Sequence, residues 1–458
     1  MRRPPTIVLG IAVVAVALCA TAAPPAPGAV DGEELWYLAC AGRGGGDGSL
    51  ADPFRRAEDA ILHAAAGDSI VVLPIDDPSP ECVVELAPGQ RLVGADATPR
   101  PRVARVVTAA DTVVADLEIV GSEREAIAVT GGEVTIQDVA IREAAVGVLV
   151  VGGDVTLVME RVTIDGATTG AVHVLAGGRG TLEVSLRRCA VTGSSNEGLE
   201  LVVHDDATVV MEVVGSRFEN IAGPACQLAI QGEASVDATI ESVEMSGVGF
   251  GVVGFVEADS ALDLEIHDLV AIGVEATGVN LVLGSDSTSK ARVNADITGG
   301  RIAKSGGSGH GVRLTASGSG TMTARVEDTT VDGGVDFDRG ISAEAREGDG
   351  RLDVAIVGNR VEVGPAALEG ILVRARDGTT VCAELHDNVV DGGSVGIAVE
   401  QRDGGRIAMA ADRNGDVDAS TIERVLRAAN RAATVVVTAE EPVRLVTACG
   451  REPRADGG

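Results

Sequence analysis

The sequence predicts an all-β solenoid, a stack of short strands wound into coils, and three observations lead to this prediction. The 458 residues are 45% hydrophobic but only 2% aromatic, so the core must consist of Val, Ile, Leu and Ala. β-Branched residues favour strands, and 60 glycines supply the turns between them. Short alternating apolar runs, each ended by a Gly, Asp or Asn turn, recur along the chain, as in 134–141 and 383–391. Repetition of this kind indicates stacked units.

The repeats occupy residues 83–410 and predict about eleven coils. Two strands and their turns fit within the shortest spacing between repeats, whereas a compact helical repeat needs about 34 residues. Inward-facing residues such as Ile127, Val129, Ile371 and Val373 are expected to align into apolar columns. The predicted repeat starts are Thr112, Glu133, Val155, Thr181, Thr208, Ser235, Ala261, Ala291, Thr321, Arg351 and Val381.

Aspartate and asparagine side chains are expected in the turns of these coils. Asp138, Asp268, Asn359, Asn388 and Asn414 each follow an apolar run, and both residue types tolerate left-handed backbone and bond their own main chain. The coils lengthen through the middle of the chain. Because the regular repeat does not explain this lengthening, we expect function there.

The N-terminal capping unit is predicted at residues 35–82. A first strand is expected near 35–38, a helix over 52–66 with Asp52 as its N-cap and Pro53 in its first turn, and a strand over 68–73. Helical spacing places Phe54, Ala57, Ile61 and Ala65 on one face. A helix at this position would cover the open edge of the stack, which could otherwise pair with another chain.

A second cap is predicted at residues 411–450. Residues 420–430 have the pattern of a helix, and 434–438 and 443–447 have the pattern of closing strands. Residues 451–458 are expected to form a disordered tail.

A segment near the N-terminus resembles a known family. The run Gly46-Asp-Gly-Ser-Leu-Ala-Asp-Pro-Phe54, the Ala-rich stretch 57–66 and Gly67-Asp-Ser-Ile-Val-Val-Leu-Pro74 are similar to the N-terminal capping unit of exported proteins of the pectin-lyase-like superfamily. Arg55-Arg56 departs from the Thr-Ile that is usual there, which shortens the apolar face of the helix. The resemblance implies a right-handed parallel β-helix over about residues 38–430. It implies no single activity, because the superfamily includes lyases, hydrolases, epimerases and members without a known reaction.

The N-terminus predicts export. Basic residues Arg2 and Arg3 precede an apolar run over 6–20, and Ala20-Thr-Ala22 offers a cleavage site, so residues 1–22 are predicted as a signal peptide and 23–34 as a linker. The apolar run is also close to the length of an uncleaved anchor. The expected location is outside the cytoplasm: secreted, periplasmic or on the cell surface.

The cysteines favour an oxidising compartment, because an even number follows the predicted signal. Cys40 with Cys82 is the favoured disulfide, since both flank the N-terminal unit. Buried free thiols remain the alternative for Cys189 and Cys226. The six are Cys40, Cys82, Cys189, Cys226, Cys382 and Cys449.

Charge limits the ligands that the chain can bind. The formal net charge is −31, and Lys290 and Lys304 are the sole lysines. A field of this sign repels nucleic acids and anionic lipids. It also disfavours acidic polysaccharides unless calcium or a local arginine cluster reverses it. We therefore expect no nucleic acid partner and no membrane contact beyond the N-terminal signal. The expected partner is a polysaccharide or a cell-surface component, and the chain is expected to be a monomer.

The catalytic candidates are few. Asp336, Asp338 and Arg339 place two carboxylates beside a guanidinium just before a predicted strand, which suits acid–base chemistry. Asp205 and Asp206 are candidate metal ligands in a turn between coils. Adjacent acids arise by chance in a chain with 68 of them, and a solvated turn is the simpler interpretation.

Histidines, glycine-rich turns and aromatics give weaker signals. Ser308-Gly-His310-Gly resembles the Gly-His-Gly of polygalacturonases without the acidic residues that accompany it. The other coil histidines fall in different coils, which does not favour a metal ladder; they are His173, His204, His267 and His386. No cofactor is predicted beyond an unplaced structural calcium ion. Phe250 and Phe255 are expected in the core.

Two functions remain in competition. The first is a non-catalytic scaffold or binding protein, and the alternative is a polysaccharide lyase or glycoside hydrolase acting on the outer face of the β-helix. An enzyme requires carboxylates, or carboxylates and an arginine, that converge in one groove, whereas a scaffold requires no such convergence.

Overall fold

The computed structural model describes residues 34–41, 44–75, 82–284, 289–304, 308–334, 338–411 and 414–449. The predicted signal peptide, the linker up to residue 33 and the tail 451–458 lie outside these residues. The described part of the chain forms 42 strands and two helices, and its strands pair in parallel except for β39 (Gly415–Val417) with β42 (Val443–Val446). The predicted fold class, an all-β parallel solenoid with one helix near each end, is confirmed.

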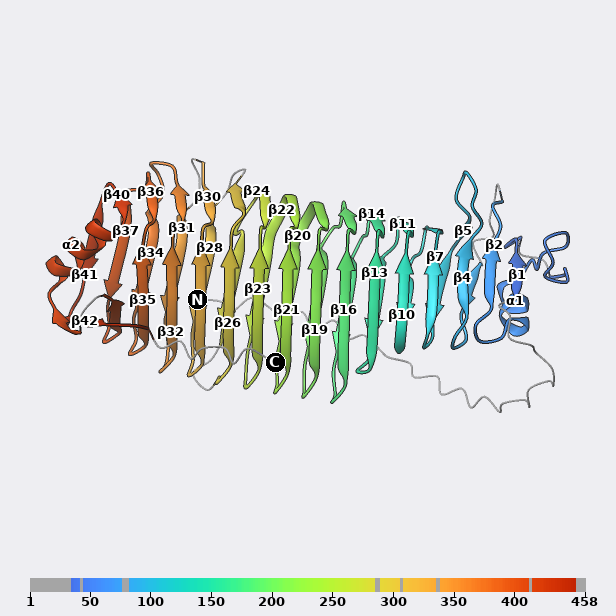
Figure 1. The fold of residues 1–458 in the computed structure, drawn as a ribbon, viewed down its shortest axis with the longest axis horizontal. Coiled ribbons are helices and arrows are strands. Elements are labelled where there is room, and N and C mark those ends of the chain that lie inside the picture. The colour runs from blue at the N-terminus through green and yellow to red at the C-terminus, as the bar shows by residue number, and fades with distance from the viewer. Residues whose placement is uncertain are drawn as a thin grey trace. The chain divides into compact units, whose positions relative to one another are not determined.

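Successive coils contribute strands to three parallel columns. The first column is sheet A, whose arrows lie side by side between α1 and α2 in Figure 1. The other two columns form sheet B, and β20 (Arg217–Ile230) and β22 (Glu244–Val256) run through both of them without a break.

The remaining strands of sheet A are β1 (Leu35–Leu38), β2 (Ser69–Val72), β4 (Arg91–Gly94), β7 (Thr112–Ala115), β10 (Gly132–Gln137), β13 (Val155–Glu160), β16 (Thr181–Arg187), β19 (Thr208–Val214), β21 (Ser235–Glu241), β23 (Ala261–His267), β26 (Arg292–Thr298), β29 (Thr321–Glu327), β32 (Arg351–Val357), β35 (Thr380–His386) and β38 (Arg406–Ala410). The short column of sheet B contains β5 (Arg102–Val103), β8 (Glu118–Val120), β11 (Ala140–Arg142), β14 (Thr163–Asp165), β17 (Ala190–Thr192), β24 (Val270–Val274), β27 (Arg301–Lys304), β30 (Thr330–Asp332), β33 (Arg360–Glu362), β36 (Val389–Asp391) and β40 (Arg431–Ala432). The long column contains β3 (Val83–Glu85), β6 (Arg105–Thr108), β9 (Glu125–Val129), β12 (Val146–Val151), β15 (Gly170–Ala176), β18 (Glu197–Val203), β25 (Val279–Leu283), β28 (His310–Ala316), β31 (Arg339–Ala345), β34 (Glu369–Ala375), β37 (Val395–Gln401) and β41 (Val435–Thr438).

The predicted coil register is confirmed along most of the stack. Between β7 and β35, each of the eleven strands of sheet A begins within one residue of a predicted repeat start. The predicted inward residues Ile127, Val129, Ile371 and Val373 are at most 1% exposed. Alternation within each strand therefore sends β-branched residues to a continuous core and leaves the other set on the outside.

The predicted aspartates and asparagines lie in turns between strands, but the expected left-handed backbone is absent at two of the asparagines. Asp138 and Asp268 have left-handed φ angles of 54° and 53°. Asn359 and Asn388 are at most 1% exposed and have no such conformation. The Asn359 Nδ2 donates to Asn388 Oδ1 at 3.0 Å, and Asn388 Nδ2 donates to Asn430 Oδ1 at 2.8 Å. These amides form a ladder inside the coil corner, because buried backbone groups there need partners.

The N-terminal helix is shorter than predicted. Helix α1 spans Ala57–His63, and Phe54 instead pairs with β1, where its N–H donates to the Tyr37 carbonyl at 2.8 Å. The ring of Phe54 packs between Trp36 and His63 and is 2% exposed. This pairing holds Phe54 in extended backbone and outweighs the capping preference of Asp52 and Pro53, so the predicted start was wrong.

The buried face of α1 shifts accordingly. It consists of Ala57 and Ala60, with Ala64 directly after the helix, whereas the predicted Ala65 is exposed. The Gln90 side chain donates to the Ala64 carbonyl at 2.7 Å and fastens this end of the helix to the next coil.

The C-terminal cap follows the prediction closely. Helix α2 spans Ala419–Ala429, with the Asp418 side chain accepting from the Thr421 N–H at 2.8 Å, and buries Ile422 and Leu426. Neither helix of the described residues is long and apolar enough to cross a membrane.

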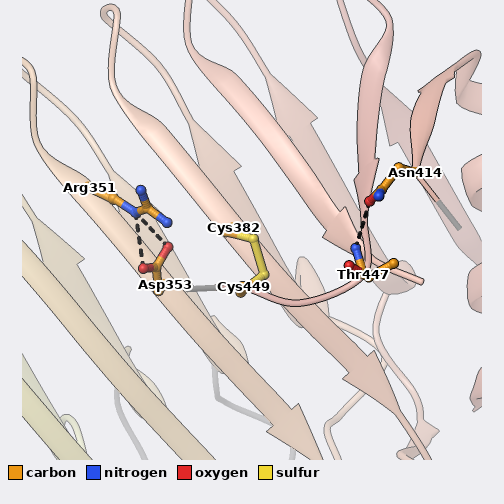
Figure 2. Close-up of a disulfide and its surroundings, with 6 residues drawn as sticks. All are labelled: Arg351, Asp353, Cys382, Asn414, Thr447 and Cys449. Carbon is orange, nitrogen blue, oxygen red and sulfur yellow. Dashed lines mark hydrogen bonds and ion pairs between the residues drawn. A yellow bond between two sulfur atoms is a disulfide. The ribbon is translucent and has the colours of Figure 1, made fainter. Parts of the chain in front are cut away.

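Two disulfides join distant segments. The predicted Cys40–Cys82 bridge is present, and Cys382–Cys449 is a second (Figure 2). The second bridge ties the end of the described chain to β35, beside the Arg351–Asp353 ion pair. Cys189 and Cys226 are buried free thiols. The two bridges fit an extracellular protein.

Candidate functional site

The outer face of the long column carries charged residues over four neighbouring coils. Inward residues of β28 and β31 such as Val312, Leu314 and Ile341 are fully buried, so alternation turns the intervening side chains of Arg313, Thr315, Ser342 and Glu344 outward. His310, Arg339 and Glu369 are instead the first residues of β28, β31 and β34. Strand register aligns these side chains across the coils. We call this set the arginine face: His310, Arg313, Thr315, Arg339, Ser342, Glu344, Glu369, Arg374 and Glu400.

Ion pairs between coils organise the arginine face. The Nε of Arg339 donates to Glu369 Oε2 at 2.7 Å. Arg374 lies between two glutamates and pairs with Glu400 at 2.7 Å and with Glu344 at 3.5 Å. These five side chains are only 10–16% exposed, although they lie on the outside of the stack. Shielding from water strengthens their electrostatic interactions.

The arginine face has three arginines and three glutamates, and its positive charge gathers at the N-terminal edge. Arg313, one coil before Ser342, faces the charges of Arg346 and Arg339. Burial and these two like charges lower the pKa of the Arg313 guanidinium. A chain of net charge −31 therefore concentrates guanidinium groups at one sheltered place.

His310 lies within this positive field. It is 8% exposed and lies beside Arg339 in the neighbouring strand. Burial first, and then the charges of Arg313 and Arg339, lower the pKa of His310 from 6.5 to about 4. Its imidazole is therefore neutral at physiological pH.

Four buried polar atoms at this edge lack hydrogen-bond partners. Within the described part of the chain, they are His310 Nδ1, Arg313 Nε, Thr315 Oγ1 and Asn280 Oδ1. Asn280 lies next to Arg313 in the preceding coil, and His310, Arg313 and Thr315 belong to one strand, β28. Unsatisfied buried polar atoms are costly and uncommon in proteins. A bound ligand with hydroxyl or carboxylate groups would satisfy them.

The carboxylates of the arginine face do not suit a glycosidase. Burial would raise the pKa of Glu344, but the guanidinium groups of Arg374 and Arg339 and a hydrogen bond from Ser342 together lower it. Glu369 and Glu400 are both paired with arginine. A glycosidase general acid needs a raised pKa, and the pKa of Glu344 is instead lowered.

A separate cluster lies further toward the N-terminus on the same outer face. His173 of β15 lies opposite Glu200 of β18, and Glu197 begins that strand. The His173 Nε2 lies 3.8 Å from Glu197 Oε2 and 3.7 Å from Glu200 Oε2. Burial raises the pKa of Glu197 and lowers that of His173. We call these residues the histidine–glutamate cluster.

The structure brings together some of the predicted site residues. Arg339 belongs to the arginine face, and Asp338 is its exposed chain neighbour. Asp336 lies outside the described residues. Asp205 and Asp206 lie in the turn after β18, where they bond His204 and Arg179 respectively. Hydrogen bonds from His204 and from the Gly178 N–H lower the pKa of Asp205. The two acids therefore lie away from Arg339 and organise their own turn.

Phe255 was predicted wrongly and bears on the site. It is 40% exposed and lies on the outer face in register with Val282, which in turn lies beside Thr315. The sequence also did not single out Arg313, Glu344, Glu369 or Arg374. Position relative to the next repeat start could have revealed Glu344, Glu369 and Arg374, but not Arg313.

The chain is similar to two solved structures but to no family model or curated protein. No known family matches the chain, and no curated protein is similar to it in sequence. Among solved structures, PfbA, a surface adhesin of Streptococcus pneumoniae, is similar at a TM-score of 0.33 and 7% identity, over 78% of this chain and 88% of that one. The catalytic unit of a GH87 alpha-1,3-glucanase from Streptomyces thermodiastaticus scores 0.29 at 13% identity, over 77% and 64% of the two chains. Scores of this size carry no argument about function.

Proposed function

We propose that the protein binds an acidic polysaccharide on the arginine face. One observation carries the proposal: buried, unpartnered polar atoms of His310, Arg313, Thr315 and Asn280 lie beside the guanidinium charge gathered at the N-terminal edge of that face. Carboxylate groups of a ligand would accept from arginine, and ligand hydroxyls would pair with the amide, hydroxyl and imidazole. The exposed Phe255 supplies an apolar surface two coils away for a sugar ring.

The arginines at this edge support an acidic ligand over a neutral one, although the net charge of −31 by itself repels acidic polymers. A neutral glycan would not need guanidinium groups concentrated against a net charge of −31. Arginine binds carboxylates with two parallel hydrogen bonds, which gives specificity as well as affinity. We further propose that the signal peptide 1–22 exports the chain, that the chain acts as a monomer, and that it belongs among the pectin-lyase-like proteins. A structural calcium ion is also proposed, with no residues assigned to it.

A lyase is the second candidate, and His310 favours it. Lyases remove a proton next to a carboxylate and need a neutral base beside a cation that binds that carboxylate. His310 is neutral above about pH 4, its Nδ1 has no partner, and the charges of Arg313 and Arg339 act on its ring, although a pKa of about 4 makes the imidazole a weak base. A hydrolase is less favoured, because the pKa of Glu344 is lowered and Glu369 and Glu400 are paired with arginines.

The test compares acidic with neutral polymers. Purified protein is titrated with polygalacturonate, alginate and dextran at two salt concentrations. We expect binding to at least one acidic polymer, weakening at higher salt, and no binding to dextran. Equal binding to dextran, or no binding to any acidic polymer, would overturn the proposal. Ultraviolet absorbance of unsaturated products in the same mixtures separates a lyase from a binding protein.

A further inference from the structure

The histidine–glutamate cluster lies on the same outer face as the arginine face but is separate from it. Glu200 and Arg313 lie four coils apart in one column, which is about 19 Å at the spacing of neighbouring strands. Neither ion pairs nor hydrogen bonds of the arginine face involve His173, Glu197 or Glu200. The cluster therefore needs its own explanation.

Three ligand atoms converge in this cluster. One nitrogen of His173 and one oxygen of each glutamate all lie within 4.8 Å of one another. Zinc ligands lie about 2.0–2.2 Å from the ion, so two tetrahedral ligands are about 3.4 Å apart. The separations of 3.7 and 3.8 Å from His173 Nε2 are too long for hydrogen bonds and close to this spacing.

Two of the three ligand atoms are buried and have no partner. Glu197 is 8% exposed, and its Oε2 lacks a hydrogen bond in the described structure, as does His173 Nε2. A carboxylate oxygen and an imidazole nitrogen without partners are costly to bury. A cation between them would satisfy both atoms, whereas no donor of the described residues does so.

The surroundings hold the ligands in place. The Gln227 Nε2 donates to Glu200 Oε1 at 3.1 Å, which leaves Oε2 directed at His173. Such a second hydrogen bond orients a ligating carboxylate. Gly170 lies opposite Glu197 in the neighbouring strand, and a Cβ there would lie 1.9 Å from His173 Nε2. The absence of a side chain at residue 170 gives the imidazole room to lie over its own strand.

We propose that His173, Glu197 and Glu200 bind one zinc ion and leave its fourth position open to water or a ligand. Imidazole with carboxylates suits zinc, and three ligands with an open position are typical of non-structural zinc sites. Calcium does not suit the cluster, because it takes six to eight oxygen ligands and imidazole is not among them. The ion ties the coils of β15 and β18 together on the outside, opposite the apolar core.

The test titrates the full chain, stripped with a chelator, with zinc chloride in a calorimeter. We expect one bound ion per chain and a higher melting temperature with zinc. Glu197→Gln and His173→Gln should each weaken zinc binding at least about tenfold, because even the loss of a residue that only hydrogen-bonds to a zinc ligand has an effect of that size. His204→Gln is the matched control, because it removes an exposed histidine from the end of β18 and should leave zinc binding unchanged.

Further measurements keep the proposal falsifiable if a variant does not fold. Cobalt bound to the wild-type chain should give the visible absorption of a tetrahedral site, and calcium should not displace it. Absence of saturable zinc binding, equal affinity for calcium, or unchanged zinc binding in folded His173→Gln would each overturn the proposal. None of these results bears on polysaccharide binding at the arginine face.

Discussion

Replacing Arg313 with Gln tests polysaccharide binding with little disturbance of the fold. Glu344 loses the attraction of Arg313 but keeps its partners Arg374 and Ser342, and the repulsion of Arg313 by Arg346 and Arg339 disappears. We therefore expect a change in the free energy of unfolding of less than about 1 kcal/mol. Replacing Arg339 would be a poorer test, because Glu369 would remain 12% exposed without a partner, at a cost of about 3–5 kcal/mol.

The expected loss of affinity follows from the lost hydrogen bond. A charge-assisted hydrogen bond contributes about 1.5–3 kcal/mol, which corresponds to about a 10- to 100-fold higher Kd for the acidic polymer. Calorimetry with polygalacturonate oligomers measures this change. Arg179→Gln is the control, because it removes the same charge from a side chain that is 89% exposed and lies on another turn. Its Kd should change less than about twofold.

The same variant has a second readout at the neighbouring imidazole. Arg313 is the largest charge effect lowering the pKa of His310, so Arg313→Gln should raise that pKa toward 6.5. Nuclear magnetic resonance of the labelled histidine ring follows the titration. Unchanged polymer affinity in Arg313→Gln, or an equal loss in Arg179→Gln, would refute a binding site at Arg313. An unchanged His310 pKa would refute the electrostatic reasoning.

Three further predictions concern stability. The pKa of His310 is about 4 in the folded chain and 6.5 in the unfolded chain, so the free energy of unfolding should fall by about 3 kcal/mol as the pH falls from 6.5 to 4. Urea unfolding of His310→Gln should show a smaller fall over the same pH range. Asn388→Ala should lower the free energy of unfolding by about 3–5 kcal/mol, because it leaves buried groups of the asparagine ladder unpaired. The exposed Asn414→Ala is the control and should lower it by less than about 1 kcal/mol. Equal urea midpoints of the two variants would contradict this prediction. Replacing both Cys382 and Cys449 by Ser should lower the free energy of unfolding by about 4 kcal/mol, because the bridge spans a separation of 67 residues. Thermal unfolding measures this change, and an unchanged melting temperature would argue against it.

The coil architecture could be predicted because it depends on properties that each repeat carries by itself. A β-branched run such as 181–187 and the turn after it define a coil without reference to distant residues. The ends depend on contacts between distant segments and were predicted less well. Phe54 pairs with β1 because its ring is buried between Trp36 and His63, and nothing in residues 52–56 alone indicates that contact.

The candidate site was predicted only at Arg339, because its chemistry depends on the alignment of coils. Arg339 and Glu369 are 30 residues apart, whereas Arg374 and Glu400 are 26 apart, so no fixed spacing finds both pairs. The distance from a residue to the next predicted repeat start would identify the first pair. Arg339 lies twelve residues before the start at 351, and Glu369 lies twelve residues before the start at 381. The same count places Glu344 and Arg374 seven residues before these starts, but it fails for Arg313, which lies eight residues before the start at 321 while its neighbour Ser342 lies nine before 351.

The choice of arginine over lysine follows from the same alignment. Arg374 pairs with Glu344 on one side and with Glu400 on the other, which spans the two coil spacings of about 10 Å between the flanking strands. A planar guanidinium presents donors in several fixed directions and can hold both carboxylates at once, whereas an ammonium group is a point charge on a flexible stem. Ion pairs of this kind fix three coils in register and leave the arginine face rigid before any ligand arrives. A rigid face loses little conformational entropy on binding. Little of the interaction free energy between Arg313, its neighbours and an acidic glycan would therefore be offset by the cost of ordering the site.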